Sequence, residues 1–247
     1  MPVNTGPPKD LAKLRALSNP SYDPIEDAPF YKGQPMLFGF LTRALSEIEL
    51  CKGQKSKDAI KEIIANVFRS AILLCPNELA DLFYFFCIKL APEYEGLETG
   101  IGHEILLKSV AKACGKSPTQ IRDSFKKEGD LGLVVQLGKS TQNTLGSFFT
   151  KKNTETKAAL NFKTVFEAFK KIAKTSGNSS QQEKENTIVK LLHDASNEES
   201  KYIVRWLEKN LKTGAAEKTF ISALARAFAY SPPNKKTTNA KKSLTDV

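Results

Sequence analysis

The chain has 247 residues, of which 40% are hydrophobic, which is enough for one large domain or two small ones. With 37 Lys and Arg residues against 27 Asp and Glu, its formal net charge is +10, and this favours a polyanionic partner such as nucleic acid or an acidic membrane face. The sequence shows no secretory signal, no apolar run long enough to cross a membrane and no zinc-binding cysteine pattern, so we expect an intracellular, soluble protein.

Apolar residues at helical spacing predict a series of helices in the first part of the chain. Residues 1–18 are expected to form an N-terminal extension, followed by helices over 37–48 and 57–74. Pro76 starts a further helix and Pro92 ends it, and the middle of this helix is apolar all round, as in a helix buried among others. The next helices are expected over 103–113, from Pro118 to near Gly129, and from Asp130, as a cap, through Val135.

The second part of the chain begins with a polar linker, residues 140–157, that contains one apolar cluster. Helices are expected over 165–173 and 188–195, followed by two amphipathic helices, one carrying Ile203, Leu207 and Leu211, the other Phe220, Leu224 and Phe228. Pro232 and Pro233 end the fold, and residues 234–247 form a basic tail. We predict an all-α fold: a single multi-helix domain over 19–233, composed of two helical halves, about 19–139 and 158–233.

The turn between the last two helices carries polar residues that suit an anion. It contains Lys209, Asn210, Lys212, Thr213 and Gly214. Gly214 either ends the first helix or caps the second. The start of a helix offers free backbone N–H groups, which, beside two lysines and a threonine hydroxyl, would favour a phosphate. On this stretch alone, the alternative that the two lysines merely solvate the turn is favoured.

The sequence contains no catalytic constellation. It has no nucleophile elbow, no phosphate-binding loop and no zinc-protease motif. His103 and His193 lie at or within expected helices and are interpreted as structural. Gly100 and Gly102 form a lone G-x-G without a preceding strand, which is a weak signal for a nucleotide. We therefore expect no catalytic residue, no metal site and no cofactor in this chain.

Residues 142–149 read Q-x-x-L-x-x-F-F, which resembles the motif through which proteins bind the sliding clamp of DNA replication. In one tight helical turn, Leu145, Phe148 and Phe149 would project together into an apolar pocket, while Gln142 would anchor one end. The alternative is that the two aromatic rings fold back onto the domain.

Several segments in unbroken order, from about Asn19 to Pro233, resemble the N-terminal region of eukaryotic ATP-dependent DNA ligases of the DNA ligase I type. The matching segments are Tyr22-x-Pro24-x-Glu26-Asp27-Ala28, Leu41-x-Arg43-x-Leu45-x-x-Ile48-Glu49, Gly96-Leu97-Glu98-x-Gly100-x-Gly102, Gly129-Asp130-x-Gly132-x-Val134, Ser140-Thr141-Gln142, Phe169-x-x-Ile172-Ala173 and Leu211-Lys212-x-Gly214. The resemblance implies an all-helical DNA-binding domain. Such a domain grips the minor groove on both sides of a nick while an adenylation domain and an OB-fold domain close around the break.

The resemblance also implies roles for single residues. Positions that approach phosphates in the family match Arg43, Lys184, Lys212 and Gly214, and a Gly-x-x-Ser turn before the Lys184 helix matches Gly177 and Ser180. The chain departs from the family at three positions. The family often has Arg in place of Lys212, Arg or Lys in place of Asn210, and Asp in place of His103. Eukaryotic members carry the clamp motif near the extreme N-terminus, whereas archaeal relatives place it within the DNA-binding domain, as here.

The adenylated lysine of the family lies in a K-x-D-G motif that this sequence lacks. We therefore expect a fragment of a ligase, or a relative without the catalytic domains, which does not ligate on its own, while the parent enzyme would use ATP and Mg²⁺. The expected partners are nicked duplex DNA, the sliding clamp, and the adenylation and OB-fold domains of the same chain, with no membrane involved. We expect a nuclear monomer. Two alternatives remain: a non-catalytic helical adaptor that binds the clamp, and a general nucleic-acid binder.

Overall fold

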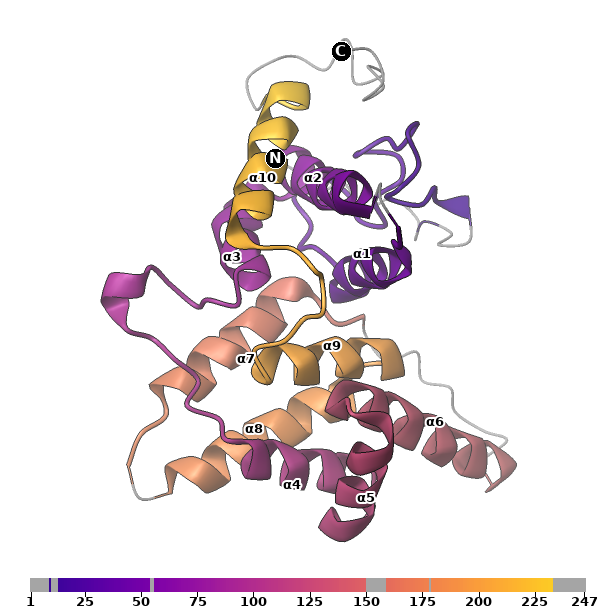
Figure 1. Cartoon of the computed structure of the whole chain (residues 1–247), viewed down its shortest axis with the longest axis vertical. Coiled ribbons are helices and arrows are strands. Elements are labelled where there is room, and N and C mark those ends of the chain that lie inside the picture. The colour runs from indigo at the N-terminus through magenta and orange to yellow at the C-terminus, as the bar shows by residue number, and fades with distance from the viewer. Residues whose placement is uncertain (1–8, 10–12, 54–55, 150–158, 178, 233–247) are drawn as a thin grey trace. The chain divides into compact units, whose positions relative to one another are not determined.

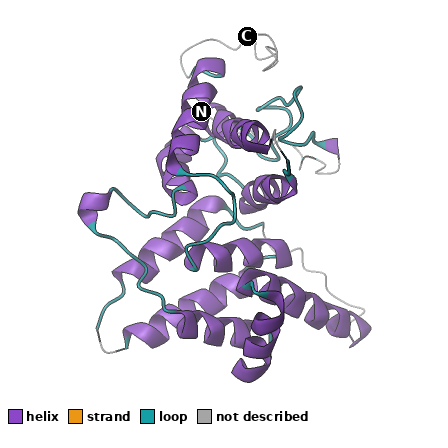
Figure 2. Cartoon of the chain, in the orientation of Figure 1, coloured by secondary structure: helices purple, strands orange, loops and turns teal. Residues whose placement is uncertain are grey.

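The computed structural model describes residues 9, 13–53, 56–149, 159–177 and 179–232, and for residues 141–149 it describes the backbone alone. Within these residues the regular elements are helices (Figure 2). An isolated antiparallel bridge between Leu37 and Asn161 accompanies them. The prediction of an all-α fold is therefore confirmed. None of the described helices combines the length and the apolar character that crossing a bilayer requires.

The chain divides into two compact units (Figure 1). The first contains Met1–Lys89, Asn161–Lys163 and Lys212–Val247, and the second contains Leu90–Leu160 and Thr164–Leu211. These units differ from the predicted linear halves, 19–139 and 158–233. The difference arises because the last helix of the chain packs against an early one, so both ends of the described chain belong to the first unit.

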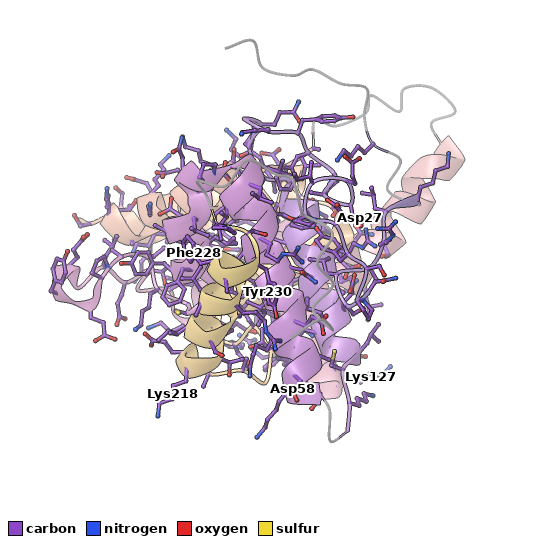
Figure 3. The ribbon with its side chains drawn as sticks, turned by 90° about the horizontal axis from the view of Figure 1, so that it is seen from above. Asp27, Asp58, Lys127, Lys218, Phe228 and Tyr230 are labelled. Atoms are coloured by element: carbon purple, nitrogen blue, oxygen red, sulfur yellow. The ribbon has the colours of Figure 1, made fainter. Side chains whose placement is uncertain are left out.

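The first unit is built around one long helix. Its helices are α1 (Phe38–Leu50), α2 (Ser56–Leu74), α3 (Leu79–Phe86) and α10 (Glu217–Tyr230), with a short 3-10 turn, η2 (Pro76–Glu78), before α3. α2 packs against α1, α3 and α10. The ring centroid of Phe86 lies 5.5 Å from that of Phe68 and 5.6 Å from that of Phe220, so aromatic packing joins α2, α3 and α10. Figure 3 shows α10 with Phe228 and Tyr230 on its last turns.

A buried polar network ties both ends of the described chain to α2. The Arg69 guanidinium donates from Nε to the Ser231 hydroxyl (3.1 Å) and from Nη1 to the Asn66 side-chain oxygen (2.9 Å). The Asn66 amide in turn donates to the Leu17 carbonyl (2.8 Å), and the Leu17 side chain is fully buried. The predicted N-terminal extension, 1–18, therefore includes residues that are part of the packed unit. The predicted basic tail, 234–247, lies outside the described residues.

Glu78 is a carboxylate that the fold buries. Its Oε2 accepts a hydrogen bond from the Met36 backbone N–H (3.3 Å), which connects η2 to the start of α1. Burial raises the pKa of the Glu78 carboxyl above its usual range, and the Met36 hydrogen bond and the positive charge of Lys163 oppose this shift. The stability of this unit should therefore depend on pH through Glu78.

The third helix ends earlier than predicted. The sequence indicated a stop at Pro92, but α3 ends at Phe86. Ile88 adopts the left-handed conformation, with φ of 55°, and the Lys89 N–H donates to the Tyr84 carbonyl (2.9 Å). This is a Schellman motif, in which glycine normally occupies the left-handed position. A β-branched residue at this position is strained, so helix propensity could not have predicted where α3 ends.

The second unit contains most of the remaining helices. These are η3 (Glu93–Glu95, a 3-10 turn), α4 (His103–Ala113), α5 (Pro118–Glu128), α6 (Leu131–Phe149), α7 (Phe162–Lys174, from Thr164 onward), α8 (Ser180–Asp194) and α9 (Asn197–Leu207). α6 packs against α9, and α4 against α8. The rings of Phe169 in α7 and Trp206 in α9 stack with centroids 4.2 Å apart.

One buried ion pair joins α6 to α9. Asp130 caps α6 by accepting a hydrogen bond from the Gly132 N–H (2.9 Å), as predicted, and its other oxygen lies 2.7 Å from a guanidinium nitrogen of Arg205. A Cβ at Gly132 would lie only 2.7 Å from the Lys201 carbonyl oxygen, so glycine allows α6 to approach α9 closely. α6 runs to Phe149 rather than to Val135. The prediction that the linker begins at residue 140 is therefore wrong for residues 140–149, and residues 150–157 lie outside the described residues.

Candidate nucleic-acid interface

Two lysines that are distant in sequence meet at one loop of the second unit. The Lys184 ammonium, in the second turn of α8, donates to the Thr99 backbone carbonyl (2.8 Å). The Lys209 ammonium, just after α9, lies 2.9 Å from an oxygen of the Glu98 carboxylate. Gly100 in the same loop has φ of 59°, and a Cβ there would lie 3.3 Å from the Lys184 nitrogen. The loop between η3 and α4 thus contacts two predicted phosphate-binding cations.

The end of α9 fixes the backbone at Lys209. The Asn210 N–H donates to the Arg205 carbonyl and the Lys209 N–H donates to the Trp206 carbonyl, both at 2.9 Å, which completes a Schellman motif. Lys209 occupies the left-handed position of this motif, with φ of 57°. A lysine in this conformation is strained relative to glycine, and strained residues often mark functional sites.

The Gly-x-x-Ser turn lies at the start of α8, as the resemblance implies. Gly177 has φ of 101°, and its carbonyl accepts a hydrogen bond from the Ser180 N–H (3.2 Å). Ser179, the N-cap residue, makes no side-chain cap, because its hydroxyl donates to the Glu183 carboxylate (2.6 Å). The Ser179 side chain therefore caps none of the first-turn N–H groups of α8, and such groups at the positive end of a helix dipole suit an anion.

The predicted phosphate turn around Gly214 differs from its expected geometry. α9 ends at Leu207 and the N-cap of α10 is Ala216, so Gly214 neither ends the first helix nor caps the second. Gly214 lies in an extended connection in the first unit with φ of 62°, and Lys212 is also left-handed, with φ of 55°. The next helix along the chain, α10, starts only at Glu217, so its N-terminus does not directly follow Lys209 or Lys212 in sequence.

Thr213 and Arg43, both in the first unit, already have partners within the protein. The Thr213 hydroxyl accepts a hydrogen bond from the Ala215 N–H (3.3 Å), and the residue is 8% exposed. Arg43 Nη2 donates to the carbonyls of Leu14 and Arg15, both at 3.1 Å. In this structure the Arg43 guanidinium thus holds the N-terminal segment against α1, and its role at a phosphate stays a prediction.

An acidic residue beside the candidate lysines was not predicted as part of the site. Glu98 appeared in the sequence only as a letter of the Gly-Leu-Glu-x-Gly segment, and its pairing with Lys209 spans 111 positions. A second carboxylate, Glu208, lies 3.5 Å from the His103 imidazole at the start of α4. The His103 ring also contacts the Phe125 ring, with centroids 4.9 Å apart. The surroundings of the two lysines therefore include negative as well as positive charge.

The clamp-like motif forms the end of a regular helix. The backbone of residues 142–149 is α-helical as part of α6. Positions 145, 148 and 149 follow the i, i+3, i+4 spacing of neighbours on one helix face. The side chains of Gln142, Leu145, Phe148 and Phe149 lie outside what the structure describes, so the choice between clamp binding and packing onto the domain stays a prediction.

The described residues offer little chemistry for metals or nucleophiles. No three His, Cys, Asp or Glu side chains among them gather as metal ligands. Burial raises the pKa of the Cys75 thiol to about 12 and that of Cys87 to about 11, with nearby carboxylates adding to the rise. Thiols with such pKa values carry little reactive thiolate at neutral pH. Among the described residues, the candidate groups for a ligand are the lysines at the loop between η3 and α4, and their positive charge suits an anion.

Comparisons with known proteins agree with this interpretation. A family model described as "DNA ligase N terminus" matches residues 37–225. The chain is 35% identical over 212 residues to DNA ligase 1 of Dictyostelium discoideum, covering 86% of this chain and 17% of that protein. It is 36% identical over 192 residues to DNA ligase 1 of Schizosaccharomyces pombe, covering 78% of this chain and 23% of that protein.

An archaeal protein also matches. DNA ligase of Pyrobaculum arsenaticum is 32% identical over 195 residues, covering 78% of this chain and 31% of that protein. The chain thus spans between 17% and 31% of the length of these three relatives.

Proposed function

The chain belongs to the DNA ligase N-terminus family, and from this membership we propose that it is the domain with which an ATP-dependent DNA ligase grips nicked duplex DNA. The parent enzyme would use ATP and Mg²⁺ in an adenylation domain and an OB-fold domain, which act while this domain holds the two sides of the nick. Without the K-x-D-G motif, the 247 residues alone should not ligate.

The convergence of Lys184 and Lys209 on the loop Glu98–Gly100 is the observation that carries the proposal. A lysine ammonium binds a phosphate as a compact positive charge, and two such groups near one loop suit successive phosphates of one strand. The first turn of α8 adds backbone N–H donors beside Lys184. In the first unit, the exposed Lys212 and the glycine turn at Gly214 would supply further contacts, and Arg43 would approach a phosphate beyond its present partners.

These contacts would position the protein without reading sequence. Phosphate oxygens carry no base code, so binding should be similar for unrelated duplexes. A ligase must act at any nick, and a grip through minor-groove phosphates satisfies this requirement. A general nucleic-acid binder would share the charge but would not prefer a nick.

Recruitment by the sliding clamp is the second part of the proposal. It rests on the Q-x-x-L-x-x-F-F pattern and on the helical spacing of positions 145, 148 and 149 at the end of α6. The clamp would receive the aromatic pair as anchors, in the manner of a short helix in an apolar groove. We propose a nuclear monomer in which clamp binding and DNA binding serve the same enzyme. A clamp-binding adaptor without a ligase partner would bind the clamp but not a nick.

Binding to matched nicked and intact duplexes tests the proposal. Fluorescence anisotropy with two DNAs of the same sequence, one carrying a single nick, should show tighter binding to the nicked duplex. Equal affinity for both would favour a general nucleic-acid binder, and the absence of binding to either would favour the adaptor.

A further inference from the structure

The Lys209 ammonium, which the proposed function assigns to a DNA phosphate, forms an ion pair with Glu98. The nitrogen and oxygen atoms of this pair are 2.9 Å apart, and the side chains of Lys209 and Glu98 remain 60% and 71% exposed. The pair is therefore open to solvent and to any ligand that approaches this loop. Exposed pairs of this kind contribute little to the stability of a fold, so stability alone gives no strong reason for the contact.

The backbone on both sides of the pair is well defined. Lys209 occupies the left-handed position that closes α9, and the next loop residue after Glu98, Thr99, accepts the hydrogen bond from Lys184. The loop thus holds Lys209 through the Glu98 carboxylate and Lys184 through the backbone carbonyl of the next residue. A carboxylate offers an ammonium the same interaction as a phosphodiester, namely two oxygen acceptors that share one negative charge.

We propose that Glu98 is an internal competitor that holds Lys209 until a DNA phosphate displaces it. The inference rests on the proposed DNA-binding function. A phosphate that reaches Lys209 must replace the carboxylate and must also tolerate its negative charge nearby, since like charges at short distance repel each other. Glu98 therefore lowers the affinity for every polyanion and favours DNA that makes enough other contacts to offset this loss. In this way one residue limits weak, unproductive binding.

The decisive variant is Glu98→Gln, which keeps the shape of the side chain and removes its charge. If Glu98 competes with phosphate, this variant binds duplex DNA more tightly than the wild type. An exposed ion pair contributes about 0.2–1 kcal/mol, which corresponds to a gain of about 1.5- to 5-fold in affinity. Binding is measured by fluorescence anisotropy with the chain of 247 residues.

A matched control separates the ion pair from overall charge. Glu95 lies three residues earlier, is exposed, and has no side-chain partner among the contacts of the described residues. Glu95→Gln changes the net charge by the same amount, so its effect on DNA affinity measures the long-range electrostatic contribution of one negative charge without the ion pair. The gain for Glu98→Gln should exceed the gain for Glu95→Gln. In a Lys209→Ala background, the effect of Glu98→Gln should shrink to that of Glu95→Gln, because the competed cation is gone.

Three results would overturn the inference while leaving the proposed function intact. Equal gains for the two glutamine variants would mean that only net charge matters. Weaker binding by Glu98→Gln would mean that Glu98 positions Lys209 for the DNA rather than competing for it. A gain that persists in full in the Lys209→Ala background would assign the effect to another cation. If the wild-type chain fails to bind duplex DNA at all, the proposed function itself falls, and the inference falls with it.

Discussion

Lys209 occupies a backbone conformation that favours glycine, and this allows its structural and binding roles to be separated by mutation. Its φ is 57° at the end of α9. The left-handed conformation destabilises the folded state by about 1–2 kcal/mol for a residue with a Cβ and does not destabilise it for glycine. Against this, glycine loses about 0.5–1 kcal/mol more conformational entropy than alanine on folding. At position 209, glycine should therefore be favoured over alanine by about 0.5–1 kcal/mol.

The comparison uses two variants, Lys209→Gly and Lys209→Ala. Both remove the ammonium and its ion pair with Glu98, so these losses cancel between them. We expect the glycine variant to melt about 1–4 °C above the alanine variant, given the size of the chain. In the interior of a right-handed helix the order would be reversed, because alanine is favoured there by about 1 kcal/mol. The sign of the difference therefore reports the backbone conformation directly.

DNA binding should not follow this difference in stability. Both variants lack the ammonium that we assign to a phosphate, so both should lose affinity by the same factor relative to the wild type. Thermal melting followed by circular dichroism and anisotropy with a duplex give the two readouts on the same samples. An alanine variant at least as stable as the glycine variant would refute the left-handed assignment. Wild-type affinity in either variant would refute the role of Lys209 in binding.

Three further predictions concern other parts of the chain. Lys184→Ala should weaken DNA binding by about 0.5–2 kcal/mol, because a charge-assisted hydrogen bond to phosphate is partly replaced by water, and should change the melting temperature little. Arg43→Ala should weaken DNA binding and should also lower the melting temperature, because the Arg43 guanidinium holds the N-terminal segment. Replacing Phe148 and Phe149 together by Ala should abolish clamp binding in a pull-down and leave the free energy of unfolding nearly unchanged. A decrease in the free energy of unfolding of about 3–5 kcal/mol per ring would instead mean that the rings belong to the core. Burial raises the pKa of the Glu78 carboxyl, so in the folded protein this carboxyl stays protonated at pH values where it is ionised in the unfolded chain. The contribution of Glu78 to the free energy of unfolding therefore falls as pH rises through the raised pKa. Glu78→Gln should therefore melt higher than the wild type at pH 7 and lose that advantage below the usual carboxyl range, and an equal difference at both pH values would contradict this assignment.

Helix positions followed from the sequence where local rules operate. Pro118 begins α5 directly after Ser117, and Ser117 and Gln120 form the reciprocal capping box that such a start favours. Asp130 caps α6 as predicted. These elements depend on residues within a few positions of each other, so their chemistry is visible in the sequence.

Other boundaries depend on conformations that composition does not reveal. α3 ends because Ile88 adopts a left-handed conformation, which its side chain disfavours. α6 continues to Phe149 through Ser, Thr, Gln and Asn residues that are typical of a linker, although its first turns are held by the buried Asp130–Arg205 pair and by close packing at Gly132. Neither boundary follows from the helix propensities of the residues that form it.

The candidate site was predictable in its cations and not in its arrangement. Lys184 and Lys209 were identified from the resemblance and from the turn, but their meeting at one loop depends on contacts across 85 and 111 positions. Glu98 was not predicted as part of the site because it is far from Lys209 along the chain, and by sequence alone a glutamate in a turn is an ordinary solvated residue.

The most direct test of the DNA-binding account is the salt dependence of affinity for a nicked duplex. Binding through about six to eight phosphate contacts predicts a log–log slope of the association constant against salt near −5 to −7, because each contact releases condensed counterions. The account predicts this slope together with tighter binding to the nicked duplex than to an intact duplex of the same sequence. A slope near zero, or undiminished binding to a DNA analogue with an uncharged backbone, would contradict it.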